Sequence, residues 1–240
     1  MQISWISRQG TQRSTNNDAA AIAHQGGNTI ALLVDAAEKG QNGQALAKHW
    51  ATTIVAKSLQ LPHPLIPEQV IALMHEEQGQ LRHNYLHEIA SYCFMHYDVQ
   101  STKLWVLTCG DCLTGTALQT YPDEWIYQPH TLNDQPSLAA QSEMRATPDQ
   151  RHLLTQCLNA RRFHMPQLHT TTLPAGASIQ MCTDGYWLEH LEQGGDISKL
   201  DDDASVLKLE TGMESINAHT DSDNLFILLS EPTGQTKDTP

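Results

Sequence analysis

Single aspartates stand beside apolar, strand-like runs at five places in this chain, and that arrangement limits how it can fold. The five are Asp18 before AAAIA, Asp35 after IALLV, Asp111 after LWVLTCG, Asp184 after SIQMCT and Asp223 before NLFILL. Such acids converge if their strands are neighbours in packed sheets. Clustered carboxylates, with backbone carbonyls and water, form the octahedral sites that Mg²⁺ or Mn²⁺ prefers. For each aspartate taken singly, capping of a local turn or helix is the alternative.

The order of apolar patterns predicts an α+β fold. Apolar or alternating runs predict strands at 2–8, 18–24 and 29–37, a hairpin from SYCFMHYDV and KLWVLTCGD, and further strands at 113–127, SIQMCTDG and NLFILLS. Helical spacing predicts helices at 42–59 and 67–87 and a third near 203–216. The segment 129–160 is polar and irregular, and we expect a flap or an insertion there. Strands, two helices and strands again predict layered sheets and helices.

Size and charge restrict the class of protein. The 240 residues are enough to bury a core, so we expect one domain over 1–230 and a flexible tail at 231–240. The 27 acidic and 14 basic residues give a net charge of -13, which repels phosphate backbones and argues against a nucleic-acid partner. No run approaches the roughly 20 apolar residues of a membrane span, and MQISWISRQG has no leader pattern. The expected location is cytoplasmic, without a membrane partner.

The five cysteines leave one redox hypothesis open. They stand at 93, 109, 112, 157 and 182, an odd number without framework spacing, and fit reduced thiols in a cytosolic protein. Cys109 and Cys112 form a C-x-x-C, which can be a thiol–disulfide pair. Such enzymes place that pair at a helix N-terminus, whereas here it follows a strand-like run. A thiol oxidoreductase is therefore the third-ranked function.

Five short motifs carry a family resemblance. They are RSTNND at 13–18, VDA at 34–36, CGDC at 109–112, CTDG at 182–185 and SDN at 222–224. Their order resembles the R-x-x-N-E-D, D-G-x-G-G, G-D-S, S-D-G and D-N motifs of the metal-dependent PP2C-type Ser/Thr protein phosphatases, the PPM family, in its compact bacterial form. The resemblance runs from about Gly10 to Leu229, and YQPHTLN near 127–133 matches a further T-x-D-H motif poorly.

The resemblance implies both a fold and a metal site. The fold would be a four-layer αββα sandwich, with two antiparallel β-sheets flanked by helices. Asp35 would bridge two Mn²⁺ or Mg²⁺ ions, and the carbonyl of Ala36 would bind one of them. Asp184 and Asp223 would bind the other ion, and Asp111 would be available to a third, weaker metal.

The resemblance also implies an activity, the hydrolysis of phosphoserine and phosphothreonine by a water that two metal ions activate. Arg13 would bind the substrate phosphate through its planar guanidinium, and Asp18 would hold a water ligand of the metals. No Ser or Cys nucleophile is required, in agreement with the absence of a G-x-S-x-G motif. The expected partner is a phosphorylated protein, the product of a Ser/Thr kinase, and the expected state is a monomer.

Departures from the family motifs support a second hypothesis. DAAEKG stands in place of D-G-x-G-G, and Asn17 stands where glutamate is usual. Ala36 would cost about 1 kcal/mol or more if its position required a positive φ. The alternative function is therefore a catalytically weak PP2C-like protein that binds phosphoproteins as a regulatory scaffold. We favour the enzyme, because the departures spare the metal-binding aspartates.

Overall fold

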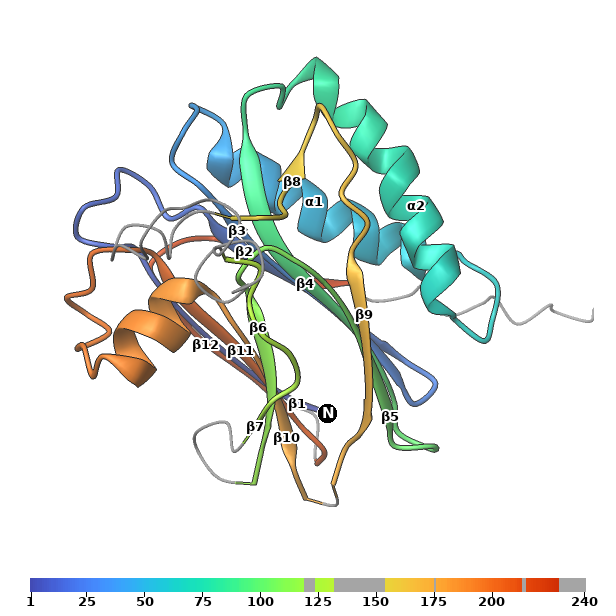
Figure 1. Cartoon of the computed structure of the whole chain (residues 1–240). Helices are drawn as coiled ribbons and strands as arrows, with labels where there is room; N and C mark the ends of the chain where they lie inside the picture. The colour runs from blue at the N-terminus through green and yellow to red at the C-terminus, as the bar shows by residue number, and fades with distance from the viewer. Residues whose placement is uncertain (119–123, 132–153, 175, 213–214, 229–240) are drawn as a thin grey trace, which may run out of the picture.

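The computed structural model describes residues 1–118, 124–131, 154–174, 176–212 and 215–228. These residues form two packed β-sheets with two α-helices on one side (Figure 1). The seven-stranded sheet has the order β13 (Leu225–Leu228), β2 (Asp18–Gln25), β3 (Asn28–Ala36), β4 (Ile89–Asp98), β5 (Lys103–Cys109) and β9 (Gln167–Thr172), with β8 (Leu158–Asn159) also paired to β4. The six-stranded sheet has the order β12 (Ser215–Thr220), β1 (Gln2–Arg8), β11 (Ala204–Glu210), β10 (Ser178–Cys182), β6 (Leu113–Ala117) and β7 (Glu124–Trp125).

The predicted α+β sandwich of two packed sheets is confirmed. The sheets are mixed, because β12 runs parallel to β1 and β13 runs parallel to β2. The other strand pairs described in both sheets are antiparallel.

Helices cover the outer face of the seven-stranded sheet. α1 (Gly43–Ser58) and α2 (Pro67–Gln80) lie side by side there, and Pro67 occupies the first turn of α2, where a missing N–H costs nothing. A short 3₁₀ turn, η1 (Leu81–His83), follows α2. The π-helix η3 (Gly185–Glu192) packs against β11 of the other sheet. No helix in the described part of the chain is long and apolar enough to cross a bilayer.

Strand alternation divides the apolar residues between two cores. Ala20 and Ile22 of β2 face the space between the sheets, together with Leu33 of β3. The intervening alanines of β2, which include Ala19 and Ala21, face the helices. Their small side chains leave room for the backbone of α1 to approach β2 closely. The run AAAIA is therefore an apolar strand with a different partner on each face.

A buried asparagine joins the two sheets. Asn224, which follows β12 and precedes β13, accepts hydrogen bonds from Trp5 Nε1 (3.0 Å) and Thr220 Oγ1 (3.0 Å). Its amide nitrogen donates to Ser7 Oγ (2.8 Å) and to the carbonyl of Asp18 (3.1 Å). The amide thereby links β1 of one sheet to β2 of the other, and this link fixes the start of β2.

Two helix predictions were wrong in whole or in part. The helix expected near 203–216 is absent, because β11 and β12 occupy that segment. β11 lies between β1 and β10 and is buried on both faces, so Val206, Leu207 and Leu209 lack the alternation of a half-exposed strand. The helix expected over 67–87 ends earlier, at Gln80, and continues only as η1. Most of the predicted flap at 129–160 and the tail at 231–240 lie outside the described residues.

Replacing the buried asparagine tests its structural role. We expect Asn224→Ala to lower the free energy of unfolding by about 3 kcal/mol, because the buried Trp5 Nε1 and the Asp18 carbonyl lose their partner. Urea unfolding followed by fluorescence measures this difference. The control Asn217→Ala, on the exposed face of β12, should change stability by less than about 0.5 kcal/mol. Equal effects of the two variants would contradict the assignment.

Candidate functional site

Three of the predicted aspartates meet at one end of the sandwich. Asp18 and Asp35 are cross-strand partners in the antiparallel pair β2–β3. Both share the face of Ala20 and Leu33, so their carboxylates project into the space between the sheets. Asp184 follows β10 of the other sheet, and its carboxyl group lies near that of Asp35.

Asp111 extends this row along the seven-stranded sheet. Ser91 of β4 is the cross-strand partner of Asp35, and its Oγ accepts a hydrogen bond from the N–H of Asp111 (3.2 Å). Gly110 makes the turn possible, because its φ is +104° and a Cβ there would lie 2.2 Å from Ser91 Oγ. Gly110 N–H also donates to the buried imidazole of His130 (3.1 Å). We call Asp18, Asp35, Asp111 and Asp184 the aspartate cluster.

Burial and mutual repulsion both act on the carboxyl groups of the aspartate cluster. Burial, together with the neighbouring carboxylates, raises the pKa values of Asp18, Asp35 and Asp184 well above their usual range. Asp18 is fully buried, and only its Oδ2 accepts a hydrogen bond, from Thr183 Oγ1 (3.2 Å). Its Oδ1 is buried and has no hydrogen-bond partner in the described part of the chain. A nearby cation would stabilise the ionised form of these carboxylates.

The donor set fits a hard divalent cation in its chemistry. Carboxylate oxygens at a partly open edge are ligands that Mg²⁺ and Mn²⁺ prefer, and waters complete their coordination. Within the described ranges, however, no three His, Cys, Asp or Glu side chains are already arranged as a metal site. A bound ion would therefore need backbone or water oxygens in addition to the carboxylates.

Ala36 fits its position without strain. It is a regular residue of β3 and is buried on the helix side, and its N–H donates to the carbonyl of Asn17 (3.3 Å). Thr102 is the one non-glycine residue with a positive φ in the described structure. The cost expected for alanine at a glycine-like conformation therefore does not arise.

Arg13 lies near the aspartate cluster but already has acidic partners. Its Nε and Nη2 donate to the two carboxylate oxygens of Asp202, at 2.6 and 2.5 Å. Its Nη1 lies 3.7 Å from Glu38 Oε2. About a third of the side chain is exposed, so the outer edge of the guanidinium faces solvent. Asp202 and Glu38 hold the guanidinium in one orientation.

Asp203 is a structural residue that the motifs did not reveal. It is buried, and its two carboxylate oxygens accept the backbone N–H groups of Gly10 (2.9 Å) and Asn17 (2.7 Å). The Asp203 carboxylate thereby fixes the two ends of the loop that carries Arg13. Burial is the largest influence on this carboxyl group and raises its pKa to about 6. It follows Asp202 at the start of β11, in the segment expected to be helical, which explains why the motif search missed it.

Asp223 lies at the same end of the sandwich but is exposed. The parallel pairing of β13 with β2 begins with Leu225 beside Ala20, and Asp223 precedes β13 by two residues. No contact between Asp223 and the aspartate cluster is present among the described residues. Its predicted role as a metal ligand stays a prediction.

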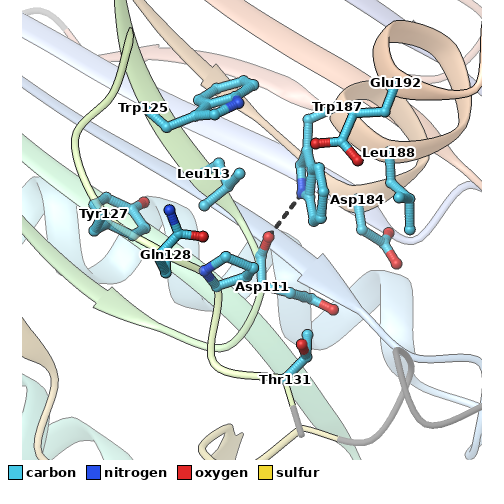
Figure 2. A pocket seen from close by; sticks show the side chains of 11 residues that line it. Asp111, Leu113, Trp125, Tyr127, Gln128, Thr131, Asp184, Trp187, Leu188 and Glu192 are labelled. Atoms are coloured by element: carbon cyan, nitrogen blue, oxygen red, sulfur yellow. Dashed lines mark hydrogen bonds between the residues drawn. The ribbon is translucent and has the colours of Figure 1, made fainter. Parts of the chain in front are cut away.

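A pocket of about 260 Å³ opens next to the aspartate cluster. Figure 2 shows Asp111 and Asp184 at its lining, with the indoles of Trp125 and Trp187 on two sides. Trp187 Nε1 donates to the carbonyl of Asp111 (2.9 Å), which fixes this indole against the β5–β6 turn. η3 begins directly after Asp184, in a segment where the sequence patterns predicted no helix. We call this cavity the indole pocket; its lining is Asp111, Leu113, Trp125, Tyr127, Gln128, Pro129, Thr131, Asp184, Trp187, Leu188 and Glu192.

The C-x-x-C pair has the wrong environment for thiol–disulfide chemistry. Cys109 and Cys112 are buried, and burial raises the pKa values of both thiols above their ordinary range. Cys109 ends β5, and β6 follows at Leu113. None of the five cysteines forms a disulfide. Reactive cysteines need a lowered pKa and access to solvent, so this geometry disfavours the oxidoreductase hypothesis.

Comparison with solved structures identifies the fold. No family model matches the chain, and no curated protein sequence matches it. A bacterial serine phosphatase is 15% identical, with a TM-score of 0.69, over 89% of this chain and 98% of that chain. The serine/threonine phosphatase Stp1 from Staphylococcus aureus is 14% identical, with a TM-score of 0.69, over 88% of this chain and 95% of that chain. The PPM Ser-Thr phosphatase MsPP from Mycobacterium smegmatis, in complex with cacodylate, is 17% identical, with a TM-score of 0.64, over 88% and 98%.

At these identities the likeness shows the fold alone. The chain has the compact sandwich of bacterial PPM-type Ser/Thr phosphatases, over most of its own length and nearly all of theirs. The resemblance stated from the five motifs is confirmed at that level.

The raised pKa values predict how stability depends on pH. A carboxyl group with a raised pKa in the folded state contributes stability below its unfolded pKa, and that stability is lost as the pH rises through the folded pKa. For Asp203 this window runs from 3.8 to about 6. In EDTA we expect the free energy of unfolding to fall as the pH rises through this window. Chemical denaturation at a series of pH values measures it.

Two variants distinguish the contribution of Asp203 to this pH dependence from the titration of other carboxyl groups. Asp203→Asn should flatten the slope within the window, whereas Glu76→Gln, exposed on α2, should leave it unchanged. Mn²⁺ or Mg²⁺ should raise the melting temperature more as the pH increases, because the cluster carboxylates, whose pKa values are raised, bind cations only when ionised. A metal effect that grew on acidification would contradict this account.

Thiol reactivity provides an independent check. Near neutral pH, we expect iodoacetamide to modify the half-buried Cys157 of the native protein and to spare Cys109 and Cys112. Mass spectrometry of proteolytic peptides locates the modified thiols, and denatured protein should react at all five. Rapid alkylation of Cys109 or Cys112 in the native protein would reinstate the oxidoreductase hypothesis.

Proposed function

We propose that this chain is a metal-dependent protein phosphatase that hydrolyses phosphoserine and phosphothreonine. The observation that carries the proposal is the meeting of Asp18, Asp35 and Asp184, from two different sheets, with raised pKa values at one open end of the sandwich. Burying like charges together is costly, so such a cluster indicates a function that uses it. The likeness to bacterial Ser/Thr phosphatase structures supports the reaction class.

The cofactors in this proposal are two Mn²⁺ or Mg²⁺ ions. Asp35, the carbonyl of Ala36, Asp184 and Asp223 would hold them, and Asp111 would be available to a third. When bound, such ions neutralise phosphate charge and make water a stronger nucleophile near neutral pH. The Oδ1 of Asp18, which has no hydrogen-bond partner among the described residues, and the closeness of the Asp35 and Asp184 carboxyl groups support this use of the carboxylates.

The chain's own side chains would orient the reactants. Thr183 holds one oxygen of Asp18, so the other oxygen is positioned to accept a hydrogen bond from water. Asp202 holds Arg13 through two donors, and the remaining N–H groups at the exposed edge are available to a phosphate oxygen. Arg13 would then position the substrate without first reorganising its side chain.

The same Arg13 geometry keeps the second function under consideration. Two carboxylates already contact the guanidinium, and their negative charge weakens its attraction for a phosphate. Weaker phosphate binding at Arg13 would lower turnover, and low turnover is what distinguishes the scaffold from the enzyme. The two functions differ in one measurable quantity, the turnover of a phosphorylated substrate in the presence of metal.

The cellular setting belongs to the same proposal. The substrate would be a phosphoprotein made by a Ser/Thr kinase, and the enzyme would act as a monomer in the cytoplasm. Five cysteines without a disulfide support a reducing compartment.

Metal-dependent turnover tests the proposal directly. We expect hydrolysis of p-nitrophenyl phosphate and of a phosphothreonine peptide with Mn²⁺ or Mg²⁺, and none with EDTA. Asp35→Asn and Asp184→Asn should each lower kcat/KM by about 100-fold or more, because each removes a charge that the ions require. Phosphate release measures the rate.

A matched variant controls for charge alone. Asp196→Asn removes an exposed aspartate on the loop after η3 and should keep turnover within about twofold of the parent protein. Near-parental activity of Asp35→Asn would show that the assigned roles are wrong. A folded protein that binds a phosphopeptide but shows no turnover with either ion would favour the scaffold.

A further inference from the structure

Three of the seven arginines of this chain lie together on the surface near the end of α2. Arg82 belongs to η1, whereas Arg161 and Arg162 follow β8, and all three residues are exposed. Arg82 Nε donates to the carbonyl of Ala160 (3.1 Å), and its Nη2 donates to the carbonyl of Arg161 (3.4 Å). In Figure 1 the chain after β8 accordingly reaches the end of α2. We call Arg82, Arg161 and Arg162 the arginine cluster.

The hydrogen-bond partners of the arginine cluster are neutral groups. Arg82 contacts two backbone carbonyls, and Arg161 Nη2 donates to Nδ1 of His87 (3.4 Å), which accepts only when that nitrogen carries no proton. None of the ion pairs between described residues involves these three guanidinium groups. Within that part of the chain their charge is therefore not neutralised, and most of their N–H donors stay available. Arg13 differs, because two carboxylates contact it.

A turn after β8 fixes the backbone of two members of the arginine cluster. The side-chain carbonyl of Asn159 accepts the N–H groups of Arg161 (3.0 Å) and Arg162 (2.9 Å). The next residue, Phe163, packs against the imidazole of His75 on α2, with ring centroids 4.6 Å apart. The two guanidinium groups are thus carried by a backbone that is held on both sides, so little order has to be gained when they bind an anion.

The sheet places the arginine cluster near the proposed reaction centre. Ala90 of β4 is the cross-strand partner of Ala36 on one side and of Leu158 of β8 on the other. Strands are about 4.8 Å apart, so β8 lies roughly 10 Å from the strand of Asp35. Arg161 comes three residues after Leu158, at most about 10 Å further along the chain. An extended peptide covers the resulting distance of about 10 to 20 Å with about three to six residues.

The arginine cluster is a local exception in an acidic protein. The net charge of -13 repels phosphorylated peptides in general. A group of guanidinium side chains without carboxylate partners therefore has a large influence on where such a peptide can approach. The planar guanidinium also matches the oxygens of a phosphate or a carboxylate, with which it forms paired, charge-assisted hydrogen bonds.

We propose that the arginine cluster binds a second anionic side chain of the substrate, phosphorylated or acidic, about three to six positions from the phosphorylated residue that is hydrolysed. This inference rests on the proposed phosphatase function and adds a substrate class to it, namely phosphoproteins in which phosphates or acidic residues are clustered. Phosphate and carboxylate share the chemistry that the guanidinium groups recognise, and the peptides of the test distinguish the two.

The test uses phosphothreonine peptides that differ at one position, about three to six residues to either side of the phosphothreonine. That position carries Ala, Glu or a phosphonate analogue of phosphoserine that cannot be hydrolysed. At one such position we expect kcat/KM for the phosphonate peptide to exceed that for the Ala peptide by about fivefold to tenfold, mainly through KM. The Glu peptide should lie between them, because a carboxylate carries less charge.

Variants of the arginine cluster should remove this preference. Arg161→Gln and Arg162→Gln should each lower the ratio by about twofold or more, and the double variant should bring it to within about twofold of unity. Circular dichroism verifies that each variant folds. The control Lys103→Gln removes one exposed charge from the opposite end of the sheet, at the start of β5, and should preserve the preference.

Two kinetic results would overturn the inference and leave the phosphatase function standing. One is equal hydrolysis of the Ala and phosphonate peptides by the parent protein at every position. The other is a preference for the phosphonate peptide that the double variant leaves unchanged.

Binding measurements cover the case in which no peptide is hydrolysed. The same peptides are then titrated calorimetrically into the parent protein and into the double variant. A lower Kd for the phosphonate peptide that is lost in the double variant supports the arginine cluster as an anion-binding surface, even though the phosphatase function has failed. Equal Kd values for the phosphonate and Ala peptides overturn it.

Discussion

Carboxylates that are held close together repel one another, and much of this sandwich serves to hold them in place. Asp18 and Asp35 are neighbours across two strands, and Asp184 reaches them from the opposite sheet. The surrounding polar residues are buried and paired: Thr183 holds Asp18, and Asn224 holds the strand from which Asp18 projects. The folded chain accepts this repulsion because two large apolar cores, one between the sheets and one beneath the helices, stabilise the rest.

Local sequence patterns predicted the aspartates of the site. They did not predict residues whose partners lie far away in the sequence. Asp35 stands at the end of an apolar run, and that position alone predicts a carboxylate at a strand terminus. Asp203 has no such mark, because its partners Gly10 and Asn17 lie almost two hundred residues away. The segment 203–216 was misassigned for a related reason, since a strand buried on both faces loses its alternation.

Agreement with the family motifs and departure from them have different structural consequences at Ala36 and Arg13. Alanine at position 36 is harmless, because the strand continues through it and its backbone adopts an ordinary conformation. Arg13 matches its motif, yet two carboxylates already contact it, a circumstance that no motif records. Arg13 matches the family motif but is held by two carboxylates, whereas Ala36 departs from the motif without strain. Agreement with a motif therefore does not by itself show which residue can perform its role.

The parallel pairs β1–β12 and β2–β13 affect the order in which the chain can fold during synthesis. β12 and β13 are the last described strands, and each completes a different sheet beside an N-terminal strand, β1 or β2. Between them, Asn224 connects both sheets at the strand that carries Asp18. During synthesis, β2 therefore has one unpaired edge and β1 has two, because both partners of β1, β11 and β12, follow residue 203. The aspartate cluster acquires its final support last, so an incomplete chain has the acids without the frame that holds them.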